Sequence, residues 1–159
     1  RNQELLDYGL PILDNSKNKR FPEIARLIGD SYYYLGEFEK SISYFNIYRE
    51  STERSFNRFD KYQLAYSYYK TQDFDNAIGF FEEVLNESDS LSQYAAYYLA
   101  NSYMKLNKKN YALNAYRHAA SFQFDSEIKE SSDFNYVKLV YDQGGAYEDV
   151  LDVLNTFLM

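Results

Sequence analysis

Apolar side chains recur at fixed distances from four tyrosines along this chain. The tyrosines are Tyr32, Tyr68, Tyr103 and Tyr141, and the intervals between them are 36, 35 and 38 residues. A large apolar residue precedes each tyrosine by four positions: Ile28, Leu64, Leu99 and Val137. A small residue precedes the first three by three positions, where the fourth has Lys138: Gly29, Ala65 and Ala100. This spacing by three and four predicts amphipathic helices.

The same pattern continues after each tyrosine. Nine positions later the sequence has Ser41, Ala77, Ala112 and Val150. Thirteen positions later it has Phe45, Phe81, Tyr116 and Leu154. Each interval therefore predicts two helices joined by a turn, and such a pair cannot bury its apolar face alone. We expect nine helices and no strand, near residues 2–13, 22–35, 38–50, 55–71, 74–87, 90–106, 109–122, 126–143 and 146–158.

Local signals set the expected boundaries. Gly36 and the pair Gly144–Gly145 supply the permissive backbone that a tight helix–helix turn requires. Asp73 and Asp125 precede apolar-periodic stretches, where they would cap helix N-termini. Pro11 follows Gly9, so we expect the first helix to be kinked or irregular there.

The segments LIGDSYYYLGEFEKSISYF (27–45), LAYSYYKTQDFDNAIGFF (64–81), LANSYMKLNKKNYALNAY (99–116) and VKLVYDQGGAYEDVLDVL (137–154) resemble the tetratricopeptide repeat family. The second and third depart from its motif because Gln72 and Asn107 replace the turn glycine. The fourth departs at Lys138 and Val150, whose larger side chains we expect to widen or shift the fourth helix pair. The resemblance covers residues 22–159 and implies an all-α, right-handed α-α superhelix of about nine helices. It also implies a segment of a longer bacterial multi-repeat protein.

The expected organisation is one array over residues 1–159. Residues 1–14 would be the second helix of a preceding repeat, and four repeats would follow at 22–52, 55–88, 90–123 and 126–159.

Composition narrows the function classes. The 159 residues include 19 tyrosines and 12 phenylalanines, carry a formal net charge of −7 and contain no cysteine. An acidic chain lacks the clustered Lys and Arg that bind a nucleic-acid backbone, so we expect no nucleic-acid partner. No apolar run approaches the roughly 18 residues that span a bilayer, so we expect no membrane insertion. The sequence fits either the periplasm or the cytoplasm, because a leader peptide would lie outside this segment.

Residue patterns for chemistry are nearly absent. His118 is the only histidine of the chain, and we interpret it as a surface residue. Glu82 and Glu83 fit a solvated helix face, and Asp60 and Asp133 fit helix entries. We therefore expect no enzyme, no catalytic residue, no metal and no cofactor.

In the repeat family, one face of each first helix lines a concave groove. By spacing, that face carries Arg26, Asp30, Tyr62, Tyr66, Tyr69, Lys70, Tyr94, Tyr97, Asn101, Met104 and Lys105 here. A tyrosine-rich wall suits contact with an extended peptide, although some of these rings could instead fill space between repeats. We expect Tyr62, Tyr66, Tyr97 and Asn101 to be accessible. The family's carboxylate clamp of Lys and Asn is disfavoured, because Asp30 occupies a position that needs a neutral donor.

The sequence thus predicts a scaffold that binds an unidentified protein or peptide. The alternative is a regulatory or sensor arm of a larger signalling or transcription protein, with its effector domain outside this segment. The last stretch, VLDVLNTFLM (150–159), has apolar residues at seven of ten positions. Because a terminal repeat should present a polar outer face, we expect self-association through the C-terminal helix pair.

Overall fold

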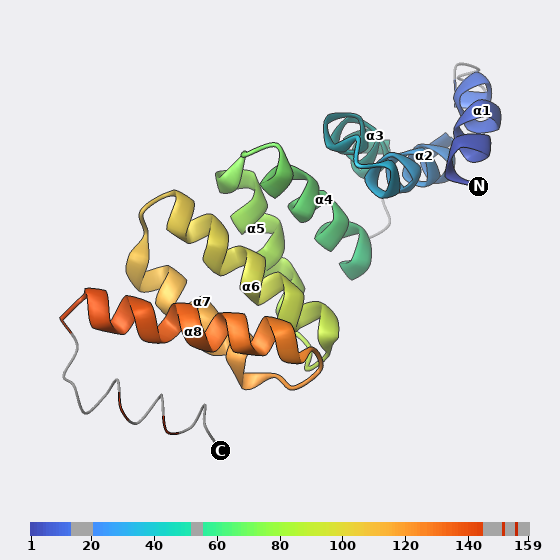
Figure 1. The fold of residues 1–159 in the computed structure, drawn as a ribbon. Coiled ribbons are helices and arrows are strands. Elements are labelled where there is room, and N and C mark those ends of the chain that lie inside the picture. The colour runs from blue at the N-terminus through green and yellow to red at the C-terminus, as the bar shows by residue number, and fades with distance from the viewer. Residues whose placement is uncertain (14–20, 52–55, 145–150, 152–154, 156–159) are drawn as a thin grey trace. The chain divides into compact units, whose positions relative to one another are not determined.

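The computed structural model describes residues 1–13, 21–51, 56–144, 151 and 155. These residues form eight helices and no strand (Figure 1). The helices are α1 (Asn2–Leu13), α2 (Phe21–Leu35), α3 (Phe38–Ser51), α4 (Arg58–Lys70), α5 (Phe74–Val84), α6 (Ser90–Lys105), α7 (Lys109–Ser121) and α8 (Ser126–Asp142). The all-α prediction is confirmed. The ninth expected helix, 146–158, lies almost wholly outside the described residues.

The chain divides into two compact units, Arg1–Phe80 and Phe81–Met159. In unit 1, α2 packs against α1, α3 and α4. In unit 2, α6 packs against α7, and α8 packs against both of them. Contacts between first helices of successive repeats, α2 with α4 and α6 with α8, therefore occur inside each unit.

Small residues permit close packing between the two helices of a repeat. A Cβ on Gly29 would lie 3.2 Å from Cγ and from the backbone nitrogen of Phe45, so α2 and α3 approach each other closely there. The Ser41 hydroxyl donates to the Gly29 carbonyl at 2.9 Å in the same contact. Ala65 and Ala100, three residues before their tyrosines, are fully buried. The predicted small positions are thus packing positions in the first three repeats.

The turns that follow α2, α4, α6 and α8 share one backbone conformation at one residue each. Gly36, Gln72, Asn107 and Gly144 have φ values of 76°, 65°, 56° and 75°. Each of these residues donates its N–H to the carbonyl three positions earlier, at 3.0 to 3.1 Å. Gln72 and Asn107 therefore adopt the left-handed conformation that the motif normally gives to glycine, and loss of the turn glycine does not change the turn.

The turn at Gly144 corrects the register of the fourth repeat. Gly36 N–H donates to Tyr33, and Gly144 N–H donates to Tyr141, so Tyr141 is equivalent to Tyr33 and not to Tyr32. Exposure agrees, because Tyr141 is 69% exposed whereas Tyr32 is 7% exposed. The prediction that Tyr141 occupies the repeat position of Tyr32, Tyr68 and Tyr103 is wrong, and Val140 occupies that position.

The same shift changes the interpretation of Lys138. In the corrected register Val137 occupies the small-residue position, and Lys138 is an exposed residue of α8. Buried Ser132 and Leu139 then align with positions that are also buried in α4 and α6. The expectation that Lys138 widens the fourth helix pair is therefore wrong. Val150 lies outside the described residues.

Three further local expectations have clear outcomes. Asp125 caps α8 by accepting from the Ile128 N–H at 3.0 Å, and Asp73 accepts from the Asn76 N–H at 3.3 Å, so both predicted caps are confirmed. Pro11 lies within α1, which continues to Leu13. Asp133 is not a helix entry, since it lies in the middle of α8 and pairs with Lys129 at 2.7 Å.

Candidate binding face

Within each unit, the first helices of the repeats carry side chains at equivalent positions. We define the first-helix face by the positions −6, −2, +1 and +2 relative to Tyr32, Tyr68, Tyr103 and Val140. In unit 1 these residues are Arg26, Asp30, Tyr33, Tyr34, Tyr62, Tyr66, Tyr69 and Lys70. In unit 2 they are Tyr97, Asn101, Met104, Lys105, Phe134, Lys138, Tyr141 and Asp142.

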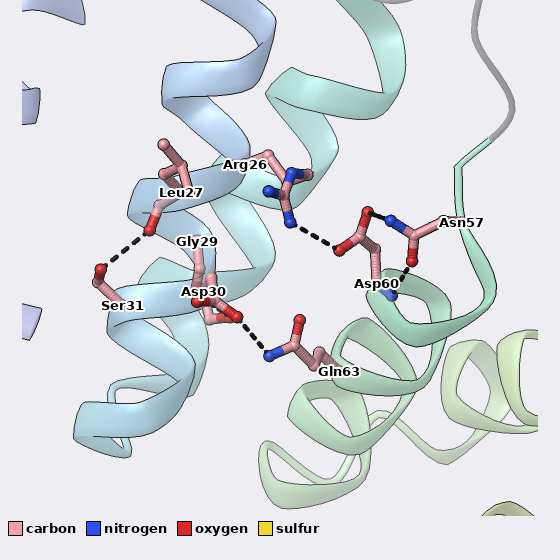
Figure 2. Close-up of polar contacts among 9 residues, drawn as sticks. Arg26, Leu27, Gly29, Asp30, Ser31, Asn57, Asp60 and Gln63 are labelled. Atoms are coloured by element: carbon pink, nitrogen blue, oxygen red, sulfur yellow. Dashed lines mark hydrogen bonds and ion pairs between the residues drawn. The ribbon is translucent and has the colours of Figure 1, made fainter. Parts of the chain in front are cut away.

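Two polar pairs join α2 to α4 in unit 1 (Figure 2). Arg26 Nη1 donates to Asp60 Oδ1 at 3.3 Å, and Gln63 Nε2 donates to Asp30 Oδ1 at 2.6 Å. Asp60 and Gln63 are fully buried. The predicted groove residues Arg26 and Asp30 therefore hold the two helices together.

The environment of Asp60 is unusual for a carboxylate. Asn57 donates its side-chain amide to Asp60 Oδ2 at 2.5 Å and accepts the Asp60 N–H at 2.8 Å, which caps α4. Burial raises the pKa of Asp60 above its ordinary value, and the charge of Arg26 only partly opposes this shift. As predicted, Asp60 lies at a helix entry, but its side chain also belongs to the contact between helices.

An aromatic cluster continues from these polar pairs in unit 1. The Tyr33 ring lies 5.8 Å from Tyr66 and 6.2 Å from Phe38, measured between centroids. Tyr66 also lies 6.2 Å from both Tyr62 and Tyr69. Burial and the neighbouring Tyr66 raise the pKa of Tyr33 to about 12. These rings contact one another across α2, α3 and α4.

Tyr62 differs from the expectation of accessibility. Its side chain is only 9% exposed and stacks on Tyr66, whereas Tyr66 and Tyr69 are half-buried. Lys70 is exposed, and its ammonium lies 5.7 Å from the Phe38 ring centroid. Tyr66, Tyr69 and Lys70 thus keep solvent-facing surface in unit 1.

In unit 2, α6 is fixed to the start of α8 by two side chains. The Gln93 amide donates to the Asp125 carbonyl at 2.9 Å and accepts the Asp125 N–H at 2.8 Å. The Tyr94 hydroxyl donates to the Asp125 carboxylate, and this bond lowers the pKa of that carboxyl. The hydroxyl of the predicted groove residue Tyr94 is therefore engaged within the chain.

Tyr97 and Asn101 share a neighbour on α7. The Tyr116 hydroxyl donates to Asn101 Oδ1 at 2.5 Å, and the Tyr97 ring lies 6.2 Å from the Tyr116 ring. Tyr97, Asn101 and Met104 are half-buried, and Lys105 is exposed. This part of the predicted site keeps accessible surface, but Asn101 Oδ1 already accepts a hydrogen bond from Tyr116.

Sequence reasoning missed three residues of this face on α8. Phe134 is 66% exposed and Tyr141 is 69% exposed, and Lys138 lies between them on the same side of the helix. They were missed because the fourth repeat was aligned on Tyr141. An alignment on Gly144, the first glycine of the turn, would have found them.

No residue pattern for catalysis emerges among the described residues. The Tyr103 hydroxyl donates to Glu82 at 2.5 Å, and the His118 ring lies 5.0 Å from the Phe122 ring. The described part holds no group of three or more His, Cys, Asp or Glu side chains arranged to bind a metal ion. Within it, none of the helices has the length and hydropathy needed to cross a membrane.

Comparison with known proteins agrees with this architecture. The family model "Tetratricopeptide repeat" matches residues 61–90. The structure is similar to MamA MSR-1, with a TM-score of 0.66, 13% identity and coverage of 98% of this chain and 93% of that chain. It is similar to MamA AMB-1, with a TM-score of 0.71, 13% identity and coverage of 98% and 88%.

A third similar structure contains the nearly identical TPR-like repeats of a putative kinesin light chain from Podosopora anserina. Its TM-score is 0.65 at 13% identity, with coverage of 98% of this chain and 84% of that chain. No curated protein matches the sequence significantly. Residues 61–90 therefore match the tetratricopeptide repeat, and the fold of the chain is similar to that of solved tetratricopeptide repeat structures. Proteins built from this repeat are in general protein-interaction scaffolds without catalytic activity.

Proposed function

We propose that this chain binds an extended segment of a partner protein along the first-helix face of one unit. The observation that carries the proposal is the partial exposure of aromatic and cationic side chains at equivalent positions of successive first helices. Tyr66, Tyr69 and Tyr97 are half-buried, so part of each side chain is accessible to a ligand. Tyrosine gives large contact area at low entropic cost, which suits recognition of a flexible segment.

The residues of this face divide into two roles in the proposal. Arg26, Asp30 and the Tyr94 hydroxyl position the helices, because each bonds to the next first helix or its cap, and Tyr62 is 9% exposed. The residues that contact the ligand in this proposal are half-buried or exposed: Tyr66, Tyr69, Lys70, Tyr97, Asn101, Met104 and Lys105. Rigid positioning residues beside adaptable contact residues reduce the entropy lost on binding.

The proposal is tested by selecting binders from a random peptide library against the whole chain and mapping each binder by amide NMR. We expect shifts and line broadening on α4, α6 and α8 at first-helix-face residues. The second helices α3 and α7 serve as the internal control and should change little. Binders that map to α3 or α7 alone would contradict the proposal.

Self-association through the C-terminal helix pair stays a separate prediction. Of residues 145–159 the structure describes only 151 and 155, and Leu151 is 36% exposed. Sedimentation at increasing protein concentration checks it. Self-association is expected, and replacement of Leu151 and Leu158 by Ser should weaken it. A monomer at high concentration would contradict it.

A further inference from the structure

Unit 1 contains a cavity of about 590 Å³ that lies among α1, α2 and α3 and opens to solvent. The described residues that line it are Leu13 of α1, Phe21 and Tyr32 of α2, and Lys40, Ser43, Tyr44 and Ile47 of α3. None of these residues occupies a position that defines the first-helix face. The volume lies within the range of roughly 300–1,000 Å³ that is usual for small-molecule sites.

The wall of this cavity is mostly apolar. Leu13, Phe21 and Ile47 are half-buried, so each keeps some apolar surface in contact with solvent. Tyr32 is 7% exposed and stacks on Tyr44, with the ring centroids 5.5 Å apart. An apolar ligand in the cavity would remove this surface from water, which favours binding.

Lys40 is the one charged side chain among the described residues that line the cavity. Its ammonium lies 5.1 Å from the centroid of the Tyr32 ring and donates a hydrogen bond to the Glu37 carboxylate. The side chains of this ion pair are 58% and 46% exposed, and exposed pairs contribute little stability. Because an ammonium has three N–H donors, Lys40 can also bind an anionic group of a ligand.

The charge and the apolar wall follow one another along α3. Ile47 comes seven residues after Lys40, which is two helical turns and roughly 10 Å along the helix axis. Residues at this spacing lie on the same side of a helix, and both line the cavity. The cavity therefore suits an elongated ligand with a negative group at one end and an apolar chain behind it.

From this arrangement we infer that the cavity binds a medium-chain aliphatic monocarboxylate. The carboxylate contacts Lys40 Nζ, and the alkyl chain contacts Leu13, Phe21 and Ile47. Binding is non-covalent. The inference goes beyond the proposed function and does not depend on it, because the two sites share no residue.

The test titrates the whole chain with octanoate and follows side-chain methyl groups by NMR. The methyl signals of Leu13 and Ile47 should shift, whereas those of Leu64 and Ile78, which are buried elsewhere in unit 1, are the internal control. Hexanoate should bind about tenfold more weakly, because it buries two fewer methylene groups. Octylammonium should bind more weakly than octanoate, because its charge has the sign of Lys40.

Three outcomes of these titrations would overturn the inference. They are unshifted Leu13 and Ile47 signals at millimolar octanoate, equal affinities for hexanoate and octanoate, and binding of octylammonium as tight as that of octanoate.

Matched variants test the role of the charge. Lys40→Gln should weaken octanoate binding about two- to fivefold and leave the binding of uncharged 1-octanol unchanged. Glu37→Gln should strengthen octanoate binding, because it removes the carboxylate that competes for Lys40. Lys129→Gln is the control, since Lys129 also pairs with a carboxylate, Asp133, but lies in unit 2. An equal loss in Lys129→Gln, or no loss in Lys40→Gln, would overturn the inference.

Discussion

The Gly144 N–H donates to the Tyr141 carbonyl at 3.0 Å, in the same way that Gly36 donates to Tyr33. This bond defines the end of α8 and therefore which side of the helix each of its residues occupies. In this register Tyr141 is an exposed residue, and Phe134 and Lys138 lie on the first-helix face. The candidate binding face of unit 2 depends on this register.

Stability measurements check the register within one unit. Tyr141→Ser should change the free energy of unfolding by no more than about 0.5 kcal/mol, because surface substitutions away from packing contacts cost little. Tyr103→Ala should cost roughly 3 kcal/mol or more, because that ring is 8% exposed and its removal leaves a cavity. Urea denaturation followed by circular dichroism measures both. Similar losses for the two variants would show that Tyr141 is buried after all.

Two glycines of unit 1 distinguish the effect of backbone conformation on stability from the effect of packing. An added Cβ at Gly36 or at Gly79 meets no atom within 4 Å, but only Gly36 has a positive φ, of 76°. Gly79→Ala should stabilise α5 by about 0.5–1 kcal/mol, as expected for a glycine inside a helix. Gly36→Ala should destabilise by about 1 kcal/mol, the cost of a left-handed alanine. Thermal unfolding shows whether each variant is stabilised or destabilised. Stabilisation by Gly36→Ala would contradict the turn geometry.

The buried Asp60 predicts a pH dependence of stability. Its pKa is raised by burial, so the folded state binds the proton more tightly than the unfolded chain does. The stability that this group contributes should therefore decrease as pH rises from its ordinary pKa of about 3.9 through its folded value. The free energy of unfolding of the wild type minus that of Asp60→Asn should fall over this window.

An exposed carboxylate in the same unit is the control. Asp75→Asn, on α5, makes the same carboxylate-to-amide change at an exposed position. A wild-type advantage over Asp60→Asn that grows with pH would mean that Arg26 outweighs burial.

Asp125 predicts the opposite sign. Its pKa is lowered first by the Tyr94 hydroxyl and then by the backbone N–H of Ile128. Its contribution to stability is present above the ordinary carboxyl pKa and is lost as pH falls through the folded value. In Tyr94→Phe the pKa of Asp125 should move up toward the ordinary range in a carboxyl NMR titration. An unchanged titration would show that the Tyr94 hydrogen bond does not form in solution.

The helices could be predicted from the sequence because the apolar spacing, the turn residues and the caps agree with one another. The described bounds of α2, α3, α6, α7 and α8 lie within one residue of those expected. The α5 helix ends earlier than expected, at Val84, and α4 begins later, at Arg58 after its Asn57 cap. The predicted bounds did not use the Asn57 cap at the start of α4, and no glycine or proline follows Val84 to mark the end of α5.

The polar contacts between helices could not be predicted in the same way. Arg26 and Asp30 have the spacing of ligand-binding residues, and only the approach of α4 shows that Asp60 and Gln63 bind them. The register of α8 was missed for a different reason. Tyr141 follows another apolar residue, Val140, so the pattern alone fits two alignments one residue apart. The hydrogen bonds of the turn decide between them.

The most direct test of the account replaces single residues of unit 2 by benzoylphenylalanine and crosslinks library-selected peptides to the whole chain. Phe134 and Tyr111 are suitable positions, because they are 66% and 62% exposed and lie on α8 and α7 respectively. The account predicts efficient peptide crosslinking from position 134 and little from position 111. Crosslinking from position 111 with none from position 134 would contradict a binding site on the first-helix face.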